Sequence, residues 1–252
     1  MKLSYLDLLS PEPIYLENIG QIISPTLRDI SRVGNTMYQQ YLWIFSMDSD
    51  AFFRFLCQDA NYEAFSETQK MSINIPELLF SYKQFRDLLQ NALNFFFVEN
   101  VFFSDQHNCF LLEENEQIIG YITPEQYPLI SDVICQKNGI TSKQEYDLSK
   151  IKNKKALEIM KKLRKGKSDS QKRATSDSNM ELGNIISAVA NKSESLNILN
   201  IWDLTIYQLW DCFTRLSNNN IYHIQAMSVA AWGDKNNHFD TSAWFKKIVS
   251  NN

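Results

Sequence analysis

The sequence has 252 residues, of which 44% are hydrophobic and 13% aromatic, and its formal net charge is −4 at pH 7. A chain of this length and composition can bury a large core, which excludes a protein that is disordered throughout. The four cysteines form no CxxC pair, so we interpret them as reduced core residues of a cytoplasmic protein. No window reaches roughly 18 uncharged apolar residues and no signal peptide is recognised, so we expect no membrane span and no export.

The first predicted elements are a small hairpin and a short helix. Two β-type runs, 14–16 and 21–23, flank the turn-forming residues Asn18 and Gly20, which predicts a hairpin. Ser24 followed by Pro25 is typical of a helix start. We therefore expect a helix from Pro25 towards Arg32 that stops at Gly34.

Helical patterns then dominate up to about residue 95. We expect one helix over 36–47, a second that begins after Asp48 or Asp50, and a single long helix from Pro76 through Leu93. The pattern changes to β-type runs separated by short polar stretches over 97–123. This change predicts an antiparallel meander inserted in a helical body.

Beyond the meander, capping signatures indicate further helix starts, and one glycine indicates a helix end. Thr123 with Gln126, and later Ser142 with Glu145, predict helix starts, and Gly139 predicts a stop. A basic helix is expected from about 153 to 165, followed by a polar linker over 166–177.

The strongest helix signal of the chain lies at 204–216, LTIYQLWDCFTRL. Thr205 and Gln208 have the spacing of a capping box, and apolar residues recur on one helix face. We expect this helix to end at Asn218–Asn220 and a separate helix to cover 221–232, with Gly233 as its stop.

Two more helices complete the C-terminal third. Ser178 and Glu181 predict a capped helix before the strong signal, and Asp240 predicts a final helix after it. The three tryptophans of this region are expected to share one core. The expected structural core residues are Leu204, Leu209, Trp210, Phe213, Leu216, Trp232 and Trp244.

The predicted fold class is mainly α, with many helices, a small antiparallel meander around 97–123 and an N-terminal hairpin. We expect a helical domain over 1–149, a basic helix and flexible linker over 150–178, and a C-terminal helical region over 179–252. The last region either packs on the first or stands apart, and the sequence leaves both arrangements open.

Motifs that carry chemistry are missing. Gly166-Lys167-Ser168 resembles the end of a phosphate-binding loop, but Lys161 occupies the position that requires a glycine. The sequence contains no GxGxxG, no HExxH, no Cys/His zinc spacing and no GxSxG. We therefore predict no catalytic residue, no cofactor site and no metal site, and a protein that is not an enzyme.

A strongly basic segment is the one charged feature with a functional interpretation. Eleven Lys or Arg against Glu158 and Asp169 give residues 150–173 a charge of +9, which leaves −13 for the rest of the chain. Such a segment can bind phosphates, but it has no interleaved aromatics, so we favour a solvated helix whose charge is matched by the acidic body or an acidic partner. The candidate contacts are Lys161, Lys162, Arg164, Lys165 and Lys167.

Two stretches at the ends of the chain resemble a known family. They are LSYLDLLSPEPIYLENIGQIISPTLRDI near the start, and IWDLTIYQLWDCFTRL with AAWGDKNNHFDTSAWFKKI near the end. Together they are similar to tail assembly chaperones encoded among the tail genes of phages and prophages of low-GC Gram-positive bacteria. The resemblance implies a largely helical protein that binds unassembled tail components, commonly the tape measure protein. It implies no functional residues, and the meander and basic segment are departures from the family.

Two hypotheses follow from these observations. In the first, the chain is a non-enzymatic assembly protein of the bacterial cytoplasm that shields a helical phage tail protein with an aromatic-rich surface and also associates with itself. In the second, the basic segment 150–173 makes it a nucleic-acid-binding adaptor. Neither hypothesis involves a membrane or a cofactor.

Overall fold

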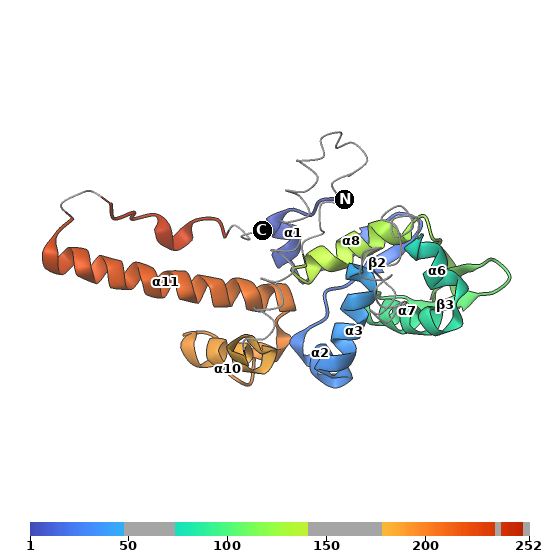
Figure 1. Cartoon of the computed structure of the whole chain (residues 1–252), viewed down its shortest axis with the longest axis horizontal. Coiled ribbons are helices and arrows are strands. Elements are labelled where there is room, and N and C mark those ends of the chain that lie inside the picture. Colours follow the sequence, from blue (N-terminus) through green and yellow to red (C-terminus); the bar gives the residue numbers. More distant parts are fainter. Residues whose placement is uncertain (48–73, 141–177, 235–237, 249–252) are drawn as a thin grey trace, which may run out of the picture. The chain divides into compact units, whose positions relative to one another are not determined.

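The computed structural model describes residues 1–47, 74–140, 178–234 and 238–248. Its described elements are mainly helices with two small antiparallel sheets, which confirms the predicted fold class (Figure 1). The chain divides into two compact units. Unit 1 comprises Met1–Ser142 together with Asp203–Gln208, and unit 2 comprises Lys143–Trp202 together with Leu209–Asn252. The predicted segment 150–178 lies almost wholly outside the described residues, so the three-part division stays a prediction.

Unit 1 opens with a short helix and the predicted hairpin. The helix α1 (Tyr5–Leu9), which the sequence analysis did not predict, begins with a capping box between Ser4 and Asp7. Strands β1 (Ile14–Leu16) and β2 (Gly20–Ile22) pair antiparallel, which confirms the hairpin. Its turn is made by Asn18, whose φ of 59° lies in the left-handed region that Asn tolerates.

The next two helices correct one prediction. Helix α2 (Leu27–Val33) begins at Thr26 rather than at Ser24, because the Thr26 hydroxyl and the Asp29 carboxylate form reciprocal bonds to each other's backbone N–H. The Ser24 hydroxyl is instead buried, without a hydrogen-bond partner among the described residues. Helix α3 (Asn35–Ser46) follows Gly34, which has φ 85° and ends α2 as predicted. The helix expected after Asp48 or Asp50 lies outside the described residues.

The single long helix expected from Pro76 is in fact two helices. Helix α6 (Ile75–Ser81) and helix α7 (Lys83–Phe96) are separated by Tyr82, whose backbone is extended with φ −94° and ψ 120°. The sequence has no Gly or Pro at this break, so apolar periodicity continues through it and a local pattern predicts one helix. Tertiary packing overrides that local preference.

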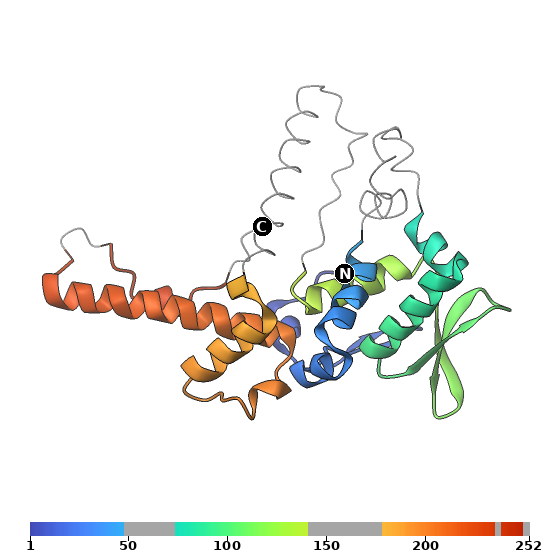
Figure 2. The same ribbon diagram turned by 60° about the horizontal axis from the view of Figure 1, so that its bottom comes forward.

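The three-stranded meander predicted for 97–123 is confirmed. Strands β3 (Asn100–Ser104), β4 (Cys109–Glu114) and β5 (Gln117–Ile122) are antiparallel neighbours in the order β3-β4-β5. A β-bulge between Leu112 and Glu113 shifts the register of the β4–β5 pair. Figure 2 shows the sheet beside α7.

Side chains and a neighbouring loop satisfy backbone groups along the outer strands of this sheet. On β3, the Asn94 amide of α7 both accepts from the Val101 N–H and donates to the Val101 carbonyl, and Gln90 accepts from the Phe103 N–H at 2.9 Å. On β5, the Tyr121 N–H donates to the carbonyl of Asn18 at 3.3 Å. These contacts reduce the capacity of either edge to pair with a further strand.

Helix α8 (Tyr127–Lys137) closes the core of unit 1 and holds the N-terminal segment. The fully buried Lys137 ammonium donates to the carbonyls of Asp7, Ser10 and Glu12 at 2.9, 2.9 and 3.4 Å. Burial lowers the pKa of Lys137 from its usual value. The predicted stop Gly139 follows with φ 73°.

The core of unit 1 is aliphatic and aromatic, and a cluster of phenylalanines joins its helices to the sheet. The Phe110 ring lies 5.1 Å from the Phe80 ring and 5.0 Å from the Phe103 ring, both edge to face. The largest fully buried apolar side chains of unit 1 are Tyr38, Phe80, Phe96, Phe110, Ile22, Leu27, Ile44, Leu79, Leu89 and Leu93.

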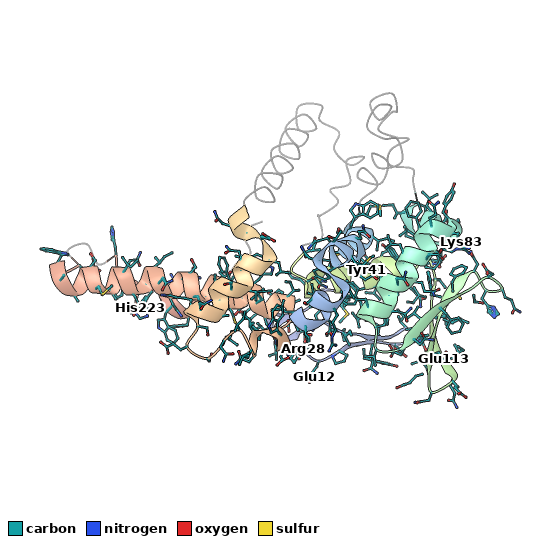
Figure 3. All side chains as sticks on the ribbon, turned by 90° about the horizontal axis from the view of Figure 1, so that it is seen from below. Glu12, Arg28, Tyr41, Lys83, Glu113 and His223 are labelled. Atoms are coloured by element: carbon teal, nitrogen blue, oxygen red, sulfur yellow. The ribbon has the colours of Figure 1, made fainter. Side chains whose placement is uncertain are left out.

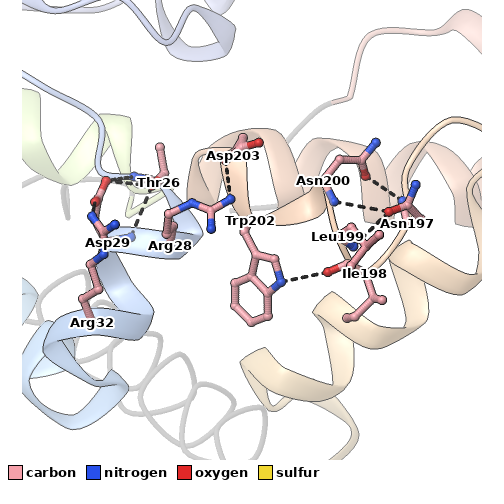
Figure 4. A network of polar contacts seen from close by, with 10 residues as sticks. All are labelled: Thr26, Arg28, Asp29, Arg32, Asn197, Ile198, Leu199, Asn200, Trp202 and Asp203. Atoms are coloured by element: carbon pink, nitrogen blue, oxygen red, sulfur yellow. Dashed lines mark hydrogen bonds and ion pairs between the residues drawn. The ribbon is translucent and has the colours of Figure 1, made fainter.

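Residues Asp203–Gln208 belong to unit 1, far from it in sequence. Thr205 forms an isolated antiparallel bridge with Thr26, and the Leu27 N–H donates to the Leu204 carbonyl at 2.8 Å. Arg28 forms an ion pair with Asp203 at 2.8 Å (Figure 4). Two helix starts, each closed by its own capping box, are thereby joined.

Unit 2 contains a shorter helix and, from Leu209 onward, the helix with the strongest sequence signal. Helix α10 (Leu182–Lys192) follows a 3-10 turn at Ser178–Met180, and its N-cap Glu181 makes no side-chain capping bond, so the predicted capping box is wrong. A second 3-10 turn, Ile201–Asp203, leads to α11 (Ile206–Trp232). In the preceding turn, Asn197 accepts from the N–H of Leu199 and the Trp202 indole donates to the Ile198 carbonyl (Figure 4).

Helix α11 corrects the expected ends of two helices. It runs without a break through Asn218–Asn220 to Trp232, so the two helices expected there are one helix of 27 residues. Relative to alanine, asparagine destabilises a helix by less than about 1 kcal/mol per residue. Ending the helix there would leave four backbone carbonyls without intrahelical partners, so continuing the helix is favoured. Gly233, with φ 78°, follows the end as predicted.

The final helix expected from Asp240 is reduced to a single 3-10 turn. This turn, Ala243–Phe245, follows Ser242, whose N–H and hydroxyl both donate to the Asp240 carboxylate. The carboxylate therefore closes a local turn instead of a helix end.

Candidate interaction surface

The second half of α11 has two faces with different surroundings within unit 2. One face lies against the C-terminal segment, where the Tyr222 and Phe239 rings are 5.4 Å apart. A shallow hollow of about 230 Å³ is lined there by Asn219, Tyr222, His223 and Trp244. His223 is labelled on α11 in Figure 3.

Carboxylates hold the C-terminal segment in this position. Asp234 accepts from the N–H groups of His238 and Phe239 at 3.0 and 2.8 Å. Asp240 forms an ion pair with Lys246. The hydrogen bond from the Lys246 side chain, with those from Ser242, holds the pKa of Asp240 well below its usual value. The segment therefore depends on ionised carboxylates.

The opposite face of α11 carries a row of exposed apolar side chains, which we call the apolar stripe. At about 100° per helical residue its members fall within an arc of about 140°. Ile221, Ile224, Met227 and Trp232 are 53, 64, 65 and 82% exposed, and Ala231 is exposed between them. The apolar stripe consists of Ile221, Ile224, Met227, Ala231 and Trp232.

Charged residues are absent from this part of the helix. Residues 216–232 include no Lys, Arg, Asp or Glu, and the polar positions are Asn, Ser, Gln, Tyr and His. A solvent-facing helix surface normally carries charged side chains, whereas contiguous exposed apolar residues mark an interaction site. The composition and exposure together make this face the candidate interaction surface of unit 2.

The first half of α11 lies beside another helix of unit 2. Helix α10, which buries Ile185, Ile186 and Val189, lies alongside the first half of α11 in both Figure 1 and Figure 2. Leu209 of α11 is fully buried. The apolar stripe lies in the half of α11 beyond this helix pair.

The predicted core residues differ in burial between the start of α11 and the rest of the C-terminal region. Leu209 is fully buried, while Leu204, Trp210, Phe213 and Leu216 are half-buried. The expected core of three tryptophans is wrong, because Trp232 is 82% and Trp244 51% exposed. An unbroken helix places Trp232 about 33 Å along the axis from Trp210, at about 1.5 Å per residue. Trp210 instead packs edge to face with Phe213 at 5.9 Å.

The predicted contacts of the basic segment cannot be placed, since Lys161, Lys162, Arg164, Lys165 and Lys167 all lie outside the described residues. Within the described ranges, no three His, Cys, Asp or Glu side chains are grouped so that they could hold a metal ion. No helix in the part of the chain that the structure describes is long and apolar enough to cross a membrane.

Sequence reasoning missed the stripe as a functional surface. The sequence predicts a helix that contains Ile221, Ile224 and Trp232, but apolar spacing alone does not distinguish a buried face from an exposed one. The missing charge over 216–232 was the available signal. In the part of the chain that the structure describes, fold and surface together define a mainly helical protein with a solvent-exposed apolar helix face.

Residues 170–249 match the family model of the YomV second domain. YomV is a protein of a Bacillus prophage region, so this part of the chain is similar to a phage-associated domain. The match covers α10, α11 and the C-terminal turn, and therefore the whole apolar stripe. No curated protein and no solved structure matches the chain.

Proposed function

We propose that this chain is a non-enzymatic phage assembly protein that binds an unassembled tail component in the cytoplasm of the bacterial host. One observation carries the proposal: the matched phage-associated segment presents Ile221, Ile224, Met227 and Trp232 to solvent on a single helix face. A protein that completed its own core would gain by burying these side chains. Their exposure supports a role in holding another protein.

The partner that fits this surface is an amphipathic helix. Helices bind apolar helix faces with residues at i, i+3, i+4 and i+7, and the tape measure protein expected from the family resemblance is helical. Because the stripe carries no charge, the partner would contribute its apolar face and keep its polar face in water. Shielding that face before assembly is the action of a chaperone.

The buried polar groups of the described residues support a structural role for this chain. Burial raises the pKa of the Cys135 thiol to about 12, so it is a poor nucleophile at neutral pH. The Tyr38 hydroxyl donates to the Asn138 side chain inside the core at 2.7 Å. These groups are engaged in packing, which favours the non-enzymatic proposal.

Co-expression with neighbouring tail genes tests the proposal. The tagged parent should co-purify a helical tail protein in low and high salt, since apolar contacts are not screened. A double variant, Ile224→Asp with Met227→Asp, should lose that protein. Asn218→Asp adds a carboxylate to the same helix outside the stripe and should retain it.

The same purification decides the alternative adaptor function. Nucleic acid that elutes as salt rises, and is lost when Lys161, Lys162, Arg164 and Lys165 are neutralised, would favour the basic segment over the stripe. Absence of any tail protein from the parent eluate, with nucleic acid present, would overturn the chaperone proposal.

A further inference from the structure

We propose that the apolar stripe pairs two copies of this chain through antiparallel α11 helices until a tail component displaces one copy. This inference rests on the proposed function, because both partners would use the same side chains. It names the occupant of the stripe when the tail component is absent.

Charge is the first argument for a second copy. A two-fold interface brings the same patch together twice, so any charge within it meets a like charge. Residues 216–232 contain no Lys, Arg, Asp or Glu, which removes that repulsion along the whole half-helix. Antiparallel helices also place opposite ends of their macrodipoles together.

Side-chain size along the stripe is compatible with an antiparallel register. With Ile224 on the two-fold axis, Ile221 of one copy faces Met227 of the other, because each lies three residues from the axis on opposite sides. The same register places Ser217 opposite Ala231, where two small side chains allow the helices to approach closely. Large residues therefore meet near the axis, small ones meet farther out, and Trp232 at the end of the stripe falls opposite Leu216.

A polar pair occurs in the same register. Ser228 lies within the arc of the stripe and is exposed, and it falls opposite Asn220, which is also exposed. A hydroxyl and an amide can form a hydrogen bond across the pair, so these two polar side chains can satisfy each other. Such a bond specifies alignment more than it adds affinity.

The area of the stripe determines the strength of pairing. Its two isoleucines, methionine, alanine and tryptophan would bury on the order of 400 Å² per copy, from the usual areas of such side chains. A standard stable interface buries roughly 800 Å² per partner. The dimer is therefore weak and exchanges readily, which allows a tail component to replace one copy.

Other exposed apolar groups suit a second copy less well. Ile118, Ile119 and Tyr121 lie on β5, but the carbonyl of Asn18 already accepts from the Tyr121 N–H. The hollow near Trp244 is small and lies on the opposite face of α11. Only the stripe combines length, exposure and absence of charge among the described residues.

The oligomeric state of the purified full chain tests the proposal. Sedimentation velocity over a range of protein concentrations should show a reversible shift of the parent from monomer to dimer. Ile224→Asp places a carboxylate on the axis and should weaken dimerisation about tenfold or more. Asn218→Asp should match the parent, and equal circular dichroism of all three would show that folding is retained.

Cysteine cross-linking tests the orientation. Equal amounts of Ser217→Cys and Ala231→Cys protein should form a disulfide-linked dimer under mild oxidation. Each variant alone should not, because identical positions lie about 21 Å apart along antiparallel helices. The parent, with its native cysteines, and Asn218→Cys serve as controls. Cross-linking of Ser217→Cys alone would overturn the antiparallel register.

These results separate the two proposals. A parent that stays monomeric at every concentration overturns self-pairing, and if it still captures a tail protein through the stripe, the proposed function stands. A dimer that depends on Ile224, from a chain that captures no tail protein, supports self-pairing and overturns the chaperone role.

Discussion

The two units differ in how far their interacting groups are satisfied within the chain. In unit 1, Asn94 and Gln90 engage the backbone of β3, and Lys137 binds three carbonyls of the N-terminal segment. In unit 2, the stripe leaves Ile224 and Met227 about two-thirds exposed. The difference lies in burial, because large apolar side chains are packed inside unit 1, whereas those of the stripe in unit 2 face solvent.

The largest expected effect is the loss of stability when a buried ring of unit 1 is removed, compared with the loss of an exposed side chain of the stripe. Phe110→Ala should lower the free energy of unfolding by about 3 to 5 kcal/mol, because the ring is fully buried against Phe80 and Phe103. Ile224→Ala, on the stripe, should change it by less than about 0.5 kcal/mol. Urea unfolding at low protein concentration measures both, and equal losses would contradict the assigned roles.

A second effect concerns the buried ammonium of unit 1. Lys137→Met keeps the length of the side chain but removes the donor from three carbonyls, so we expect a loss of about 2 kcal/mol in denaturant unfolding. Lys83→Met, at an exposed position of α7, is the matched control.

The lowered pKa of Lys137 also predicts how the free energy of unfolding depends on pH. Its folded pKa lies below the usual 10.5, so the unfolded chain binds more protons between the two values. Stability attributable to this group should therefore rise with pH across that window and level off above it. Lys137→Met should lack the rise, and an unchanged profile would assign it to another group.

A smaller effect is expected at the joined helix starts. The Thr205 hydroxyl accepts from the Gln208 N–H, and the Gln208 amide oxygen accepts from the Thr205 N–H. Thr205→Ala should cost about 1 kcal/mol, whereas Thr205→Ser keeps the capping oxygen and should cost less. Thermal unfolding of the two variants distinguishes the cap from simple loss of volume.

The smallest expected effect is the contribution of two carboxylates, one in each unit, to stability at low pH. Hydrogen bonds from Lys246 and Ser242 lower the pKa of Asp240, and those at Ser4 lower the pKa of Asp7. A lowered carboxyl pKa contributes stability that is present above the usual 3.8 and is lost as pH falls through the folded value. Unfolding midpoints between pH 5 and pH 2, in about one-unit steps, should decline less in Asp240→Asn than in the parent. An identical decline would exclude Asp240 as a contributor.

The sequence alone determined features that depend on neighbouring residues. The bonds between Thr205 and Gln208 span three positions, and the hairpin and the meander follow from alternating runs with short polar turns. These elements could be predicted because the interacting groups lie close in the chain, where chain entropy costs little.

Only the tertiary structure decided the helix boundaries and the burial of side chains where local sequence patterns were ambiguous. It divided the helix at Tyr82 and joined two helices through Asn218–Asn220. It also left Trp232 in solvent, although the residue has the same apolar character as a core tryptophan. Burial depends on which surfaces meet, and an apolar helix face has the same sequence pattern whether its partner belongs to the chain or to another molecule.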